Sequence, residues 1–288
     1  MVSAADMREK SKVLRIGDRA MHVFDAGEGP AILLLHGFPD SMALWRGVVP
    51  VLLERGYRVI APDLRGFGES DAPRGTRNYR IEHIVRDLVG LADSLGIAKA
   101  HLVGHDWGAV IGWFLAGEHG DRCHSLTAVS VGHPRAYANA GWEQKRKGLY
   151  TFLFQLRGLT EWYLSKNDFS NFRKWVRNYP ETDHWVRDLS RPGRLTAALG
   201  WYRANLWRML TGKHPRCAVP TLGIWSSRDF ALAESQMTRS EPFVDSSWRY
   251  QRLEGPSHWI PLEVPRELGE LILGHVGGIE AEQTRPKA

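Results

Sequence analysis

The segment AHLVGHDWGAV, residues 100–110, decides the fold of this chain. An apolar stretch leads into Gly104-His105-Asp106-Trp107-Gly108, and a run of small and apolar residues follows as far as Ala116. Glycines two residues before and two after Asp106 suit a tight turn with strained backbone angles at its centre and close packing on either side. The segment therefore predicts a buried strand that turns sharply into a buried helix, with the Asp106 side chain at the tip of the strand.

Asp106 stands where this strand–turn–helix pattern, the nucleophile elbow, usually carries serine. A Gly-x-Asp-x-Gly match alone is weak, because an Asp between glycines is more often an ordinary turn residue. The strand and the helix on either side favour the elbow. An ionised carboxylate there can attack a saturated carbon without a base to deprotonate it, and the product is an alkyl ester of the enzyme. This chemistry favours epoxides or alkyl halides over ordinary esters.

Strand-like and helix-like segments alternate through the first 133 residues and again near the carboxyl terminus. Such alternation predicts an α/β fold with a mostly parallel central sheet and helices on both faces. Strands are expected at residues 21–25, 31–35, 57–61, 101–103, 125–131, 221–225 and 248–253. Helices are expected near residues 42–54, 80–95, 107–118 and 266–275.

The middle of the chain breaks this alternation. After His133-Pro134 the sequence becomes rich in Trp, Tyr, Phe and Arg at helical spacing. We therefore expect a core made of residues 1–133 and 217–288, and an inserted helical cap made of residues 134–216. A cap at the carboxyl ends of parallel strands would cover the crevice where such sheets bind ligands. The polar residues 280–288 are expected to be disordered.

The composition is ordinary for a globular protein, with 43% hydrophobic and 24% charged residues among 288. No apolar stretch is long enough to span a bilayer, and the amino terminus lacks the apolar core of a secretory signal, so a cytoplasmic location is expected. Cys123 and Cys217 are expected to be reduced thiols. His101 and His105 lie four apart on an extended segment, too far for shared metal binding. Neither a metal nor an organic cofactor is expected.

The net charge of +6 is unevenly distributed. Residues 134–216 carry sixteen Lys or Arg against six Asp or Glu, whereas the rest of the chain has a slight acidic excess. The commoner explanation for such a basic excess is a solvated helical face whose arginine stems cover apolar surface. The alternative is a positive field that favours anionic substrates or partners. No nucleic-acid-binding motif accompanies the charge, so no nucleic acid partner is expected. The sequence leaves the oligomeric state open, as a monomer or a homodimer.

Two further polar residues follow predicted strands at their carboxyl ends. Asp229 lies just after the strand at 221–225, and His258 lies in the loop after the last strand. Alone, Asp229 would be read as a turn acid or a helix N-cap, and a lone histidine is more often a surface or core residue. Together with Asp106 they follow the order nucleophile, acid, histidine, which is the chain order of one class of catalytic triads.

Backbone amides complete the candidate site. The stretch Leu35-His36-Gly37-Phe38-Pro39 follows another central strand, so the N–H of Phe38 can join that of Trp107 as an oxyanion hole. These donors would stabilise charge on the ester carbonyl of Asp106 while a water activated by His258 attacks it. Asp229 would orient the imidazole. His36 is expected to be a structural hydrogen-bonding residue rather than a base.

In these residues, the chain resembles the α/β-hydrolase family, and within it the epoxide hydrolases that act through an aspartate. The resemblance is carried by His36 to Pro39, by APDLRGFGES at residues 61–70 and by the elbow, and it extends to Pro261. It implies an α/β-hydrolase fold with an inserted helical cap, and hydrolysis of a small-molecule epoxide to a vicinal diol. It also implies the roles described above for the nucleophile, the charge pair and the oxyanion donors.

The same resemblance assigns two tyrosines of the cap. Tyr150 and Tyr202 match the positions that hydrogen-bond the epoxide oxygen in that subfamily. Opening an epoxide generates a strongly basic alkoxide, and a phenol with a pKa of about 10 can protonate it while staying protonated at neutral pH. The substrate pocket is expected to be lined by Phe38, Pro39, Trp107, Phe152 and Trp201.

Two other functions stay open. A haloalkane or haloacid dehalogenase would use the same nucleophile to release halide. However, Phe38 stands where haloalkane dehalogenases usually carry Asn, and Trp107 stands where fluoroacetate dehalogenases typically carry Arg. The other alternative is a non-catalytic ligand-binding protein on the same scaffold. Such a protein would have no need for an acid, a histidine and two tyrosines in register.

Overall fold

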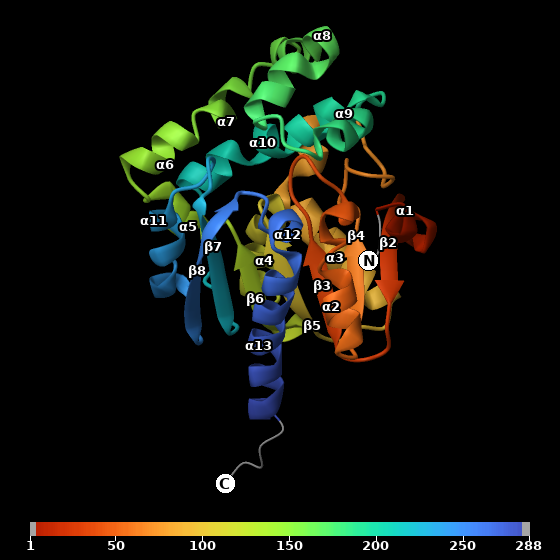
Figure 1. Ribbon diagram of the computed structural model, residues 1–288, viewed down its shortest axis with the longest axis vertical. Helices are drawn as coiled ribbons and strands as arrows, with labels where there is room; N and C mark the ends of the chain where they lie inside the picture. Colours follow the sequence, from red (N-terminus) through yellow and green to blue (C-terminus); the bar gives the residue numbers. More distant parts are fainter. Residues whose placement is uncertain (1–3, 284–288) are drawn as a thin grey trace.

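A computed structural model describes residues 4–283 and contains one sheet whose strands follow the order β1-β2-β4-β3-β5-β6-β7-β8 (Figure 1). The strands are β1 (Ser11–Ile16), β2 (Arg19–Ala26), β3 (Ala31–Leu35), β4 (Arg58–Pro62), β5 (Ala100–His105), β6 (Cys123–Val129), β7 (Thr221–Arg228) and β8 (Trp248–Ser257). β1 and β2 pair antiparallel, as do β2 and β4, and the pairs from β4 to β8 are parallel. The parallel strands therefore end at one edge of the sheet.

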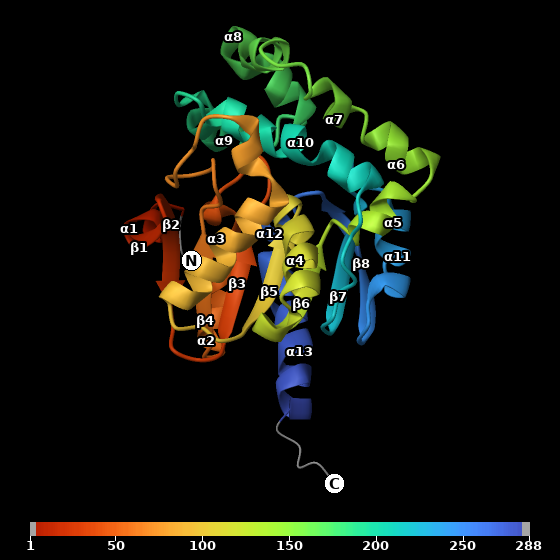
Figure 2. The ribbon, with the colours of Figure 1, turned by 180° about the vertical axis from the view of Figure 1, so that it is seen from behind.

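Strand residues alternate between two buried layers, because successive side chains of a strand point to opposite faces. Leu33, Leu35 and Leu102 pack in one layer, which includes α3 (Ile81–Ser94) and α4 (Trp107–Glu118). Leu34 and Val103 pack in the other layer, which includes α2 (Val49–Glu54) and α13 (Pro265–Gln283). Figures 1 and 2 show these two helix pairs from opposite sides of the sheet. Both faces of the parallel strands are thus covered, which explains their continuous apolar runs.

Six helices lie between β6 and β7, above the carboxyl ends of the strands (Figures 1 and 2). They are α5 (Pro134–Ala138), α6 (Trp142–Lys147), α7 (Tyr150–Leu153), α8 (Leu159–Trp175), α9 (Thr182–Ser190) and α10 (Arg194–Thr211). The remaining helices are α1 (Ala4–Glu9), α11 (Glu234–Thr238) and α12 (Ile260–Glu263). The expected α/β fold with an inserted helical cap is confirmed.

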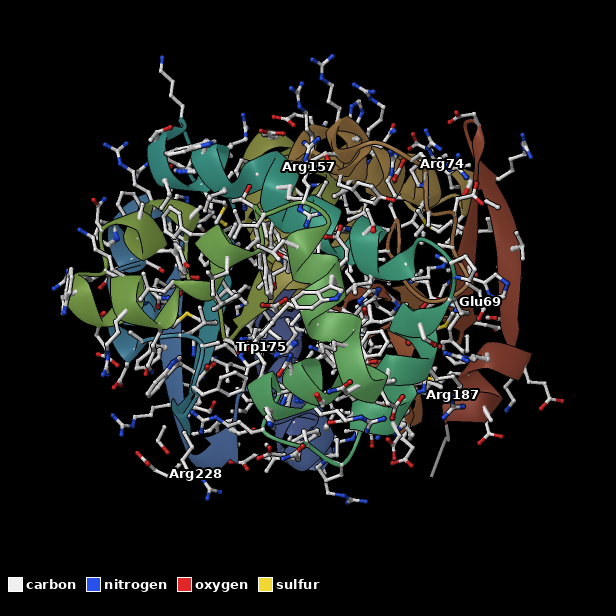
Figure 3. The ribbon with its side chains drawn as sticks, turned by 90° about the horizontal axis from the view of Figure 1, so that it is seen from above. Glu69, Arg74, Arg157, Trp175, Arg187 and Arg228 are labelled. Carbon is white, nitrogen blue, oxygen red and sulfur yellow. The ribbon has the colours of Figure 1, made fainter. Side chains whose placement is uncertain are left out.

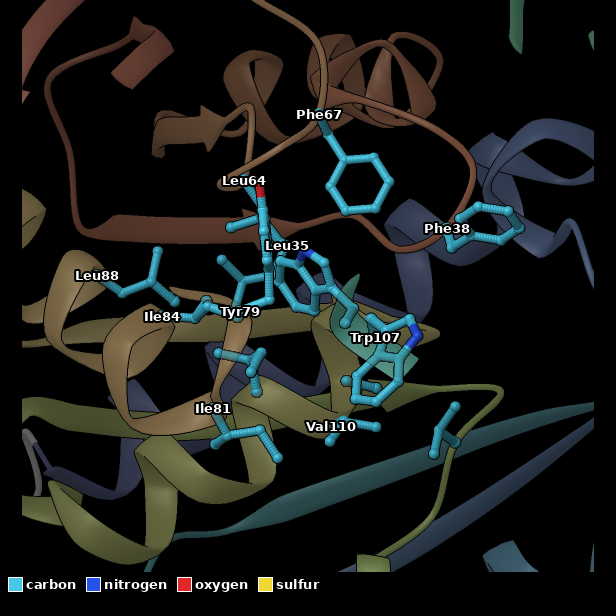
Figure 4. Close-up of a cluster of buried hydrophobic side chains, with 14 of the residues drawn as sticks. Leu35, Phe38, Leu64, Phe67, Tyr79, Ile81, Ile84, Leu88, Trp107 and Val110 are labelled. Carbon is cyan, nitrogen blue, oxygen red and sulfur yellow. The ribbon is translucent and has the colours of Figure 1, made fainter. Parts of the chain in front are cut away.

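Indole hydrogen bonds hold the cap on the core. In α9, Trp185 Nε1 donates to Asp40 Oδ2 at 2.9 Å, and in α10, Trp201 Nε1 donates to the carbonyl of Arg65 at 3.0 Å. Beneath them, one apolar cluster joins the sheet to the cap, and Figure 4 shows Phe38, Phe67 and Trp107 within it. The underside of the cap is therefore part of the hydrophobic core.

The structure corrects several element boundaries. Strand β1 was not expected; it pairs with β2 across the turn at Gly17, whose φ is 60°. The helix expected at 42–54 is a short 3-10 helix, Met42–Trp45, followed separately by α2. The disorder expected for residues 280–288 is wrong for 280–283, which continue α13. The rest of that tail lies outside the described residues.

Candidate active site

Asp106 lies at the turn between β5 and α4. Its backbone adopts φ 53° and ψ −121°, an uncommon conformation for a residue with a side chain. A Cβ added at Gly104 would lie 2.3 Å from the carbonyl oxygen of Gly108, and one added at Gly108 would lie 2.0 Å from the carbonyl oxygen of Leu35. The two glycines thus allow β3, β5 and α4 to approach closely enough to hold Asp106 in this turn.

The two oxygens of the Asp106 carboxylate face different groups. Oδ1 accepts a hydrogen bond from the backbone N–H of Phe38 at 2.9 Å, and the backbone of Trp107 also hydrogen-bonds the carboxylate. Gly37 permits this approach, because a Cβ there would lie 2.4 Å from Oδ1. Oδ2 faces His258, with 3.8 Å to Nε2. Oδ1 is therefore held by the Phe38 amide, and Oδ2 lies beside the imidazole.

His258 lies between two carboxylates. Its Nδ1 is 2.9 Å from Asp229 Oδ2, and because an ionised carboxylate only accepts, Nδ1 carries the proton. The other Asp229 oxygen accepts the backbone N–H groups of Ala231 and Leu232 at 2.8 and 2.9 Å. The Asp229 side chain is completely buried. These bonds fix the orientation of the acid, and the acid fixes the tautomer of the histidine.

Burial and charge set the proton affinities of the pair. Burial raises the pKa of Asp106 above its usual range, although the charge of His258 and the amides of Trp107 and Phe38 act against this. For His258, burial alone lowers the pKa, but the carboxylates of Asp229 and Asp106 outweigh it, and the net pKa is raised. Part of the proton affinity of His258 therefore depends on the charge of Asp106.

Three residues that sequence reasoning passed over support this arrangement. The Nε2–H of His105 donates to the backbone carbonyl of His258 at 2.9 Å. From α6, Lys147 Nζ donates to the carbonyls of Asp229 and Leu232 at 2.8 and 3.0 Å, and Gln144 Oε1 accepts the N–H of Ala233 at 2.8 Å. The cap thus supports the loop that carries the acid. No local pattern shows these roles, because each residue acts on a segment remote in sequence.

Tyr150 on α7 and Tyr202 on α10 lie over Asp106, with ring centroids 6.0 Å apart. Burial raises the pKa of both phenols well above 10, and nearby groups, Asp106 among them, raise it further. Both phenols are therefore protonated at neutral pH and can donate hydrogen bonds into the space above the carboxylate.

A cavity of about 340 Å³ lies between the core and the cap. It contains Asp106 and both tyrosines, and a third tyrosine, Tyr137 on α5, also faces it. Burial raises the pKa of Tyr137 to about 12. The other walls are mostly apolar, and Lys145 is the one charged side chain besides Asp106 among the lining residues.

Two of the five expected pocket residues, Trp107 and Phe152, line this cavity, and three do not. Phe38 and Pro39 are buried beside it, where the Phe38 ring packs on aromatic side chains of the cap. Trp201 is fully buried in the core, where its indole N–H donates to the Arg65 carbonyl. A sequence shows that such residues are large and apolar, but not whether they face a cavity or fill the core behind it.

Other sequence expectations concern ions, thiols and membranes. His36 has the structural role expected of it, since its Nε2 accepts the backbone N–H of Leu64 at 2.9 Å. Cys123 and Cys217 are free and buried. Within residues 4–283, no three His, Cys, Asp or Glu side chains converge as a metal site would require. In the same residues, no helix is both long and apolar enough to cross a bilayer.

Comparisons with known proteins identify the family to which this chain belongs. The model of the family described as "alpha/beta hydrolase fold" matches residues 30–265. Epoxide hydrolase 3 of Xenopus tropicalis is 34% identical, over 84% of this chain and 70% of that protein. The AB hydrolase superfamily protein YfhM of Bacillus subtilis is 33% identical, over 89% of this chain and 94% of that protein. The crystal structure of an epoxide hydrolase from Vigna radiata has a TM-score of 0.79 at 26% identity and covers 94% of this chain and 98% of its own.

Proposed function

Because this chain belongs to the α/β-hydrolase family, we propose that it is an epoxide hydrolase that forms vicinal diols through a covalent ester on Asp106. The observation that carries the proposal is that both cap tyrosines line the same cavity as Asp106, whose Oδ1 is held by the Phe38 amide while Oδ2 lies 3.8 Å from His258 Nε2. The cavity is small and apolar, with a nucleophile from the core and two proton donors from the cap. This arrangement suits a substrate that must be attacked and protonated together.

The first step opens the epoxide. Oδ2 of Asp106 attacks one ring carbon, a new C–O bond forms, and the C–O bond to the ring oxygen breaks. The departing oxygen would become an alkoxide, and it takes a proton from Tyr150 or Tyr202. Oδ1 keeps its hydrogen bonds to the amides and becomes the carbonyl oxygen of the ester.

The second step hydrolyses the ester. His258 takes a proton from a water while the water oxygen attacks Cγ of Asp106, and the amides of Phe38 and Trp107 stabilise the resulting oxyanion on Oδ1. The intermediate collapses, the ester C–O bond breaks, and the imidazolium protonates the leaving diol oxygen. The remaining carboxylic acid proton returns to the tyrosinate. Epoxide and water are consumed, one diol is formed, and every enzyme group regains its starting state.

Electrostatics link the two steps. Asp106 must be ionised to attack, and its charge helps to keep the pKa of His258 raised. Alkylation takes that charge off Asp106, the carboxylate beside the imidazole, and leaves it on a cap tyrosine, so we expect the pKa of His258 to fall in the ester. Loss of the Asp106 charge therefore favours the neutral imidazole at the step that requires a base.

The proposal is tested by the products formed and by trapping of the ester. The purified protein is given styrene oxide, a bromoalkane and fluoroacetate, with Asp106→Ala as the control, and diol and halide release are measured. We expect diol from styrene oxide and none from the control. His258→Gln should still form the ester, and intact-protein mass spectrometry should show the mass of one epoxide added, which peptide mapping assigns to Asp106.

Other products would overturn the assignment. Halide release without diol would make the protein a dehalogenase that uses the same nucleophile. If the His258→Gln protein turns over an epoxide without ever gaining mass, the covalent route is wrong. Tight retention of the epoxide with no product would point to a binding protein.

A further inference from the structure

Exposed large apolar side chains are concentrated on the cap. In the part of the chain that the structure describes, each of them belongs to residues 142–207, except Val13 on β1. Most lie within residues 149–163, which form α7, the following turn and the start of α8. There Leu149 is 60% exposed, Leu153 61% and Trp162 56%. We call the exposed large side chains of residues 149–163 the apolar cap face.

Packing within the chain does not account for this face. The same segment packs a different set of side chains against the rest of the protein, with Phe154 buried and Tyr150 partly buried in the core. It is therefore apolar on both its inner and its outer side. A helix that is apolar all round is normally covered on every side, and a protein that works alone in water rarely exposes such a set of side chains.

Cations surround the apolar cap face. Lys145, Arg146, Arg157 and Lys166 are all exposed, and none of them forms an ion pair with a carboxylate of residues 4–283. Figure 3 looks down on the cap and shows Arg157 on this side of the molecule. The acid within the segment, Glu161, is already bound by Arg203 at 2.6 and 2.8 Å. The face therefore combines apolar side chains with uncompensated positive charge.

We propose that the apolar cap face docks the protein on the surface of an anionic lipid bilayer. Leu, Phe and Trp side chains enter the interface between headgroups and acyl chains, while Lys and Arg beside them bind anionic headgroups. The cation of Lys166 already lies 4.9 Å from the centre of the Trp162 ring. A second copy of this chain fits less well, because it would bring one basic cap against another.

The face is continuous with the cavity. Leu149, Phe152 and Lys145 are exposed and also line the cavity that contains Asp106. Docking would therefore place the cavity opening against the bilayer. Apolar epoxides dissolved in lipid would then reach the site without first passing into water. This consequence for substrate access, unlike the docking itself, rests on the proposed function.

Vesicle sedimentation tests the docking without reference to catalysis. The full chain is mixed with vesicles of pure phosphatidylcholine, or of equal parts phosphatidylcholine and phosphatidylglycerol, and centrifuged. We expect binding to the anionic vesicles, and at least about tenfold weaker binding by Leu153→Gln/Leu156→Gln/Trp162→Gln. Arg157→Glu/Lys166→Glu should lose the preference for anionic lipid. The matched control, Val13→Gln/Arg15→Glu, changes an exposed apolar residue and a cation on β1 and should bind as the wild type does.

Three results would overturn the docking proposal. The wild type could remain in the supernatant with both vesicles, or the triple variant could sediment as the wild type does. Analytical ultracentrifugation could instead show a dimer that only the triple variant disrupts, without vesicle binding, and the face would then be an interface between copies. If the wild type binds the vesicles but does not hydrolyse epoxides, the proposed function is refuted and the docking proposal stands.

Discussion

At the scale of single residues, the site depends on which oxygen of Asp106 is free. The amide of Phe38 holds Oδ1, the backbone of Trp107 also hydrogen-bonds the carboxylate, and Oδ2 lies 3.8 Å from His258 Nε2. The carboxylate that we propose as the nucleophile is therefore oriented before any substrate binds. Such preorganisation lowers the reorganisation that the attack would otherwise require.

The tyrosines give the first prediction at this scale. Tyr150→Phe/Tyr202→Phe removes both proton donors but keeps the rings that pack with Phe154. The alkoxide would then leave unprotonated, so single-turnover ester formation should slow by about 10²–10⁴-fold. Rapid-quench mass spectrometry measures this rate, and circular dichroism checks the fold. Tyr179→Phe is the matched control, since Tyr179 stacks on Trp185 away from the cavity. Wild-type alkylation by the double variant would refute the proton-donor role.

A second residue-scale prediction concerns pH. The negative charge of Asp106 contributes to the raised pKa of His258 in the free enzyme. The ester lacks that charge, so His258 should lose its proton at a lower pH in the ester than in the free protein. Because the neutral imidazole is the base, ester hydrolysis should rise with pH through this lower pKa. NMR titration of His258 in the free enzyme and rapid-quench pH profiles give the two values. Identical values would contradict the electrostatic link.

At the scale of elements, buried side-chain bonds fix helices of the cap on the loops that follow the strands. Trp185 of α9 reaches Asp40, Gln144 of α6 reaches the backbone of Ala233, and Lys147 of α6 reaches that of Asp229. The cap therefore supplies more than walls to the cavity, because it also holds the loop that carries Asp229.

The bond between Trp185 and Asp40 gives the prediction at this scale. Trp185→Phe keeps an aromatic ring but leaves a buried carboxylate oxygen without its donor, which should reduce the free energy of unfolding by about 1–3 kcal/mol. Urea unfolding followed by circular dichroism measures the change. Trp142→Phe is the control, because Trp142 is 80% exposed, and it should shift stability by less than about 0.5 kcal/mol. Equal effects of the two substitutions would show that the buried bond adds no stability.

At the scale of the whole molecule, the cap and the core differ in net charge. Residues 134–216 carry the basic excess, and Lys145 brings a cation to the wall of the cavity. For an epoxide that bears a carboxylate, kcat/KM should therefore fall several-fold between low and physiological salt, since salt screens this attraction. A neutral epoxide of similar size serves as the reference in the same assays. The same salt dependence for both substrates would refute steering by the cap.

The sequence by itself determined the elements with strong local signals. The glycines beside Asp106 predicted the turn, and the apolar runs predicted the parallel strands, because burial on both faces leaves a continuous apolar pattern. It also placed Asp106, Asp229 and His258 at strand ends, which share one edge of a parallel sheet. Boundaries were less well determined: β1, which pairs with β2 across the turn at Gly17, was missed, and α13 extends beyond its expected end.

Only the tertiary structure decided what faces the cavity and what lies behind it. Trp201 and Phe152 are both large aromatic cap residues, yet Trp201 fills the core and Phe152 lines the cavity. Tyr137, Gln144 and Lys147 carry no local signal, since their roles depend on groups remote in sequence. The apolar cap face could not be predicted from the sequence for the same reason. Periodicity shows which residues are apolar, but only the packed chain determines which of them stay exposed.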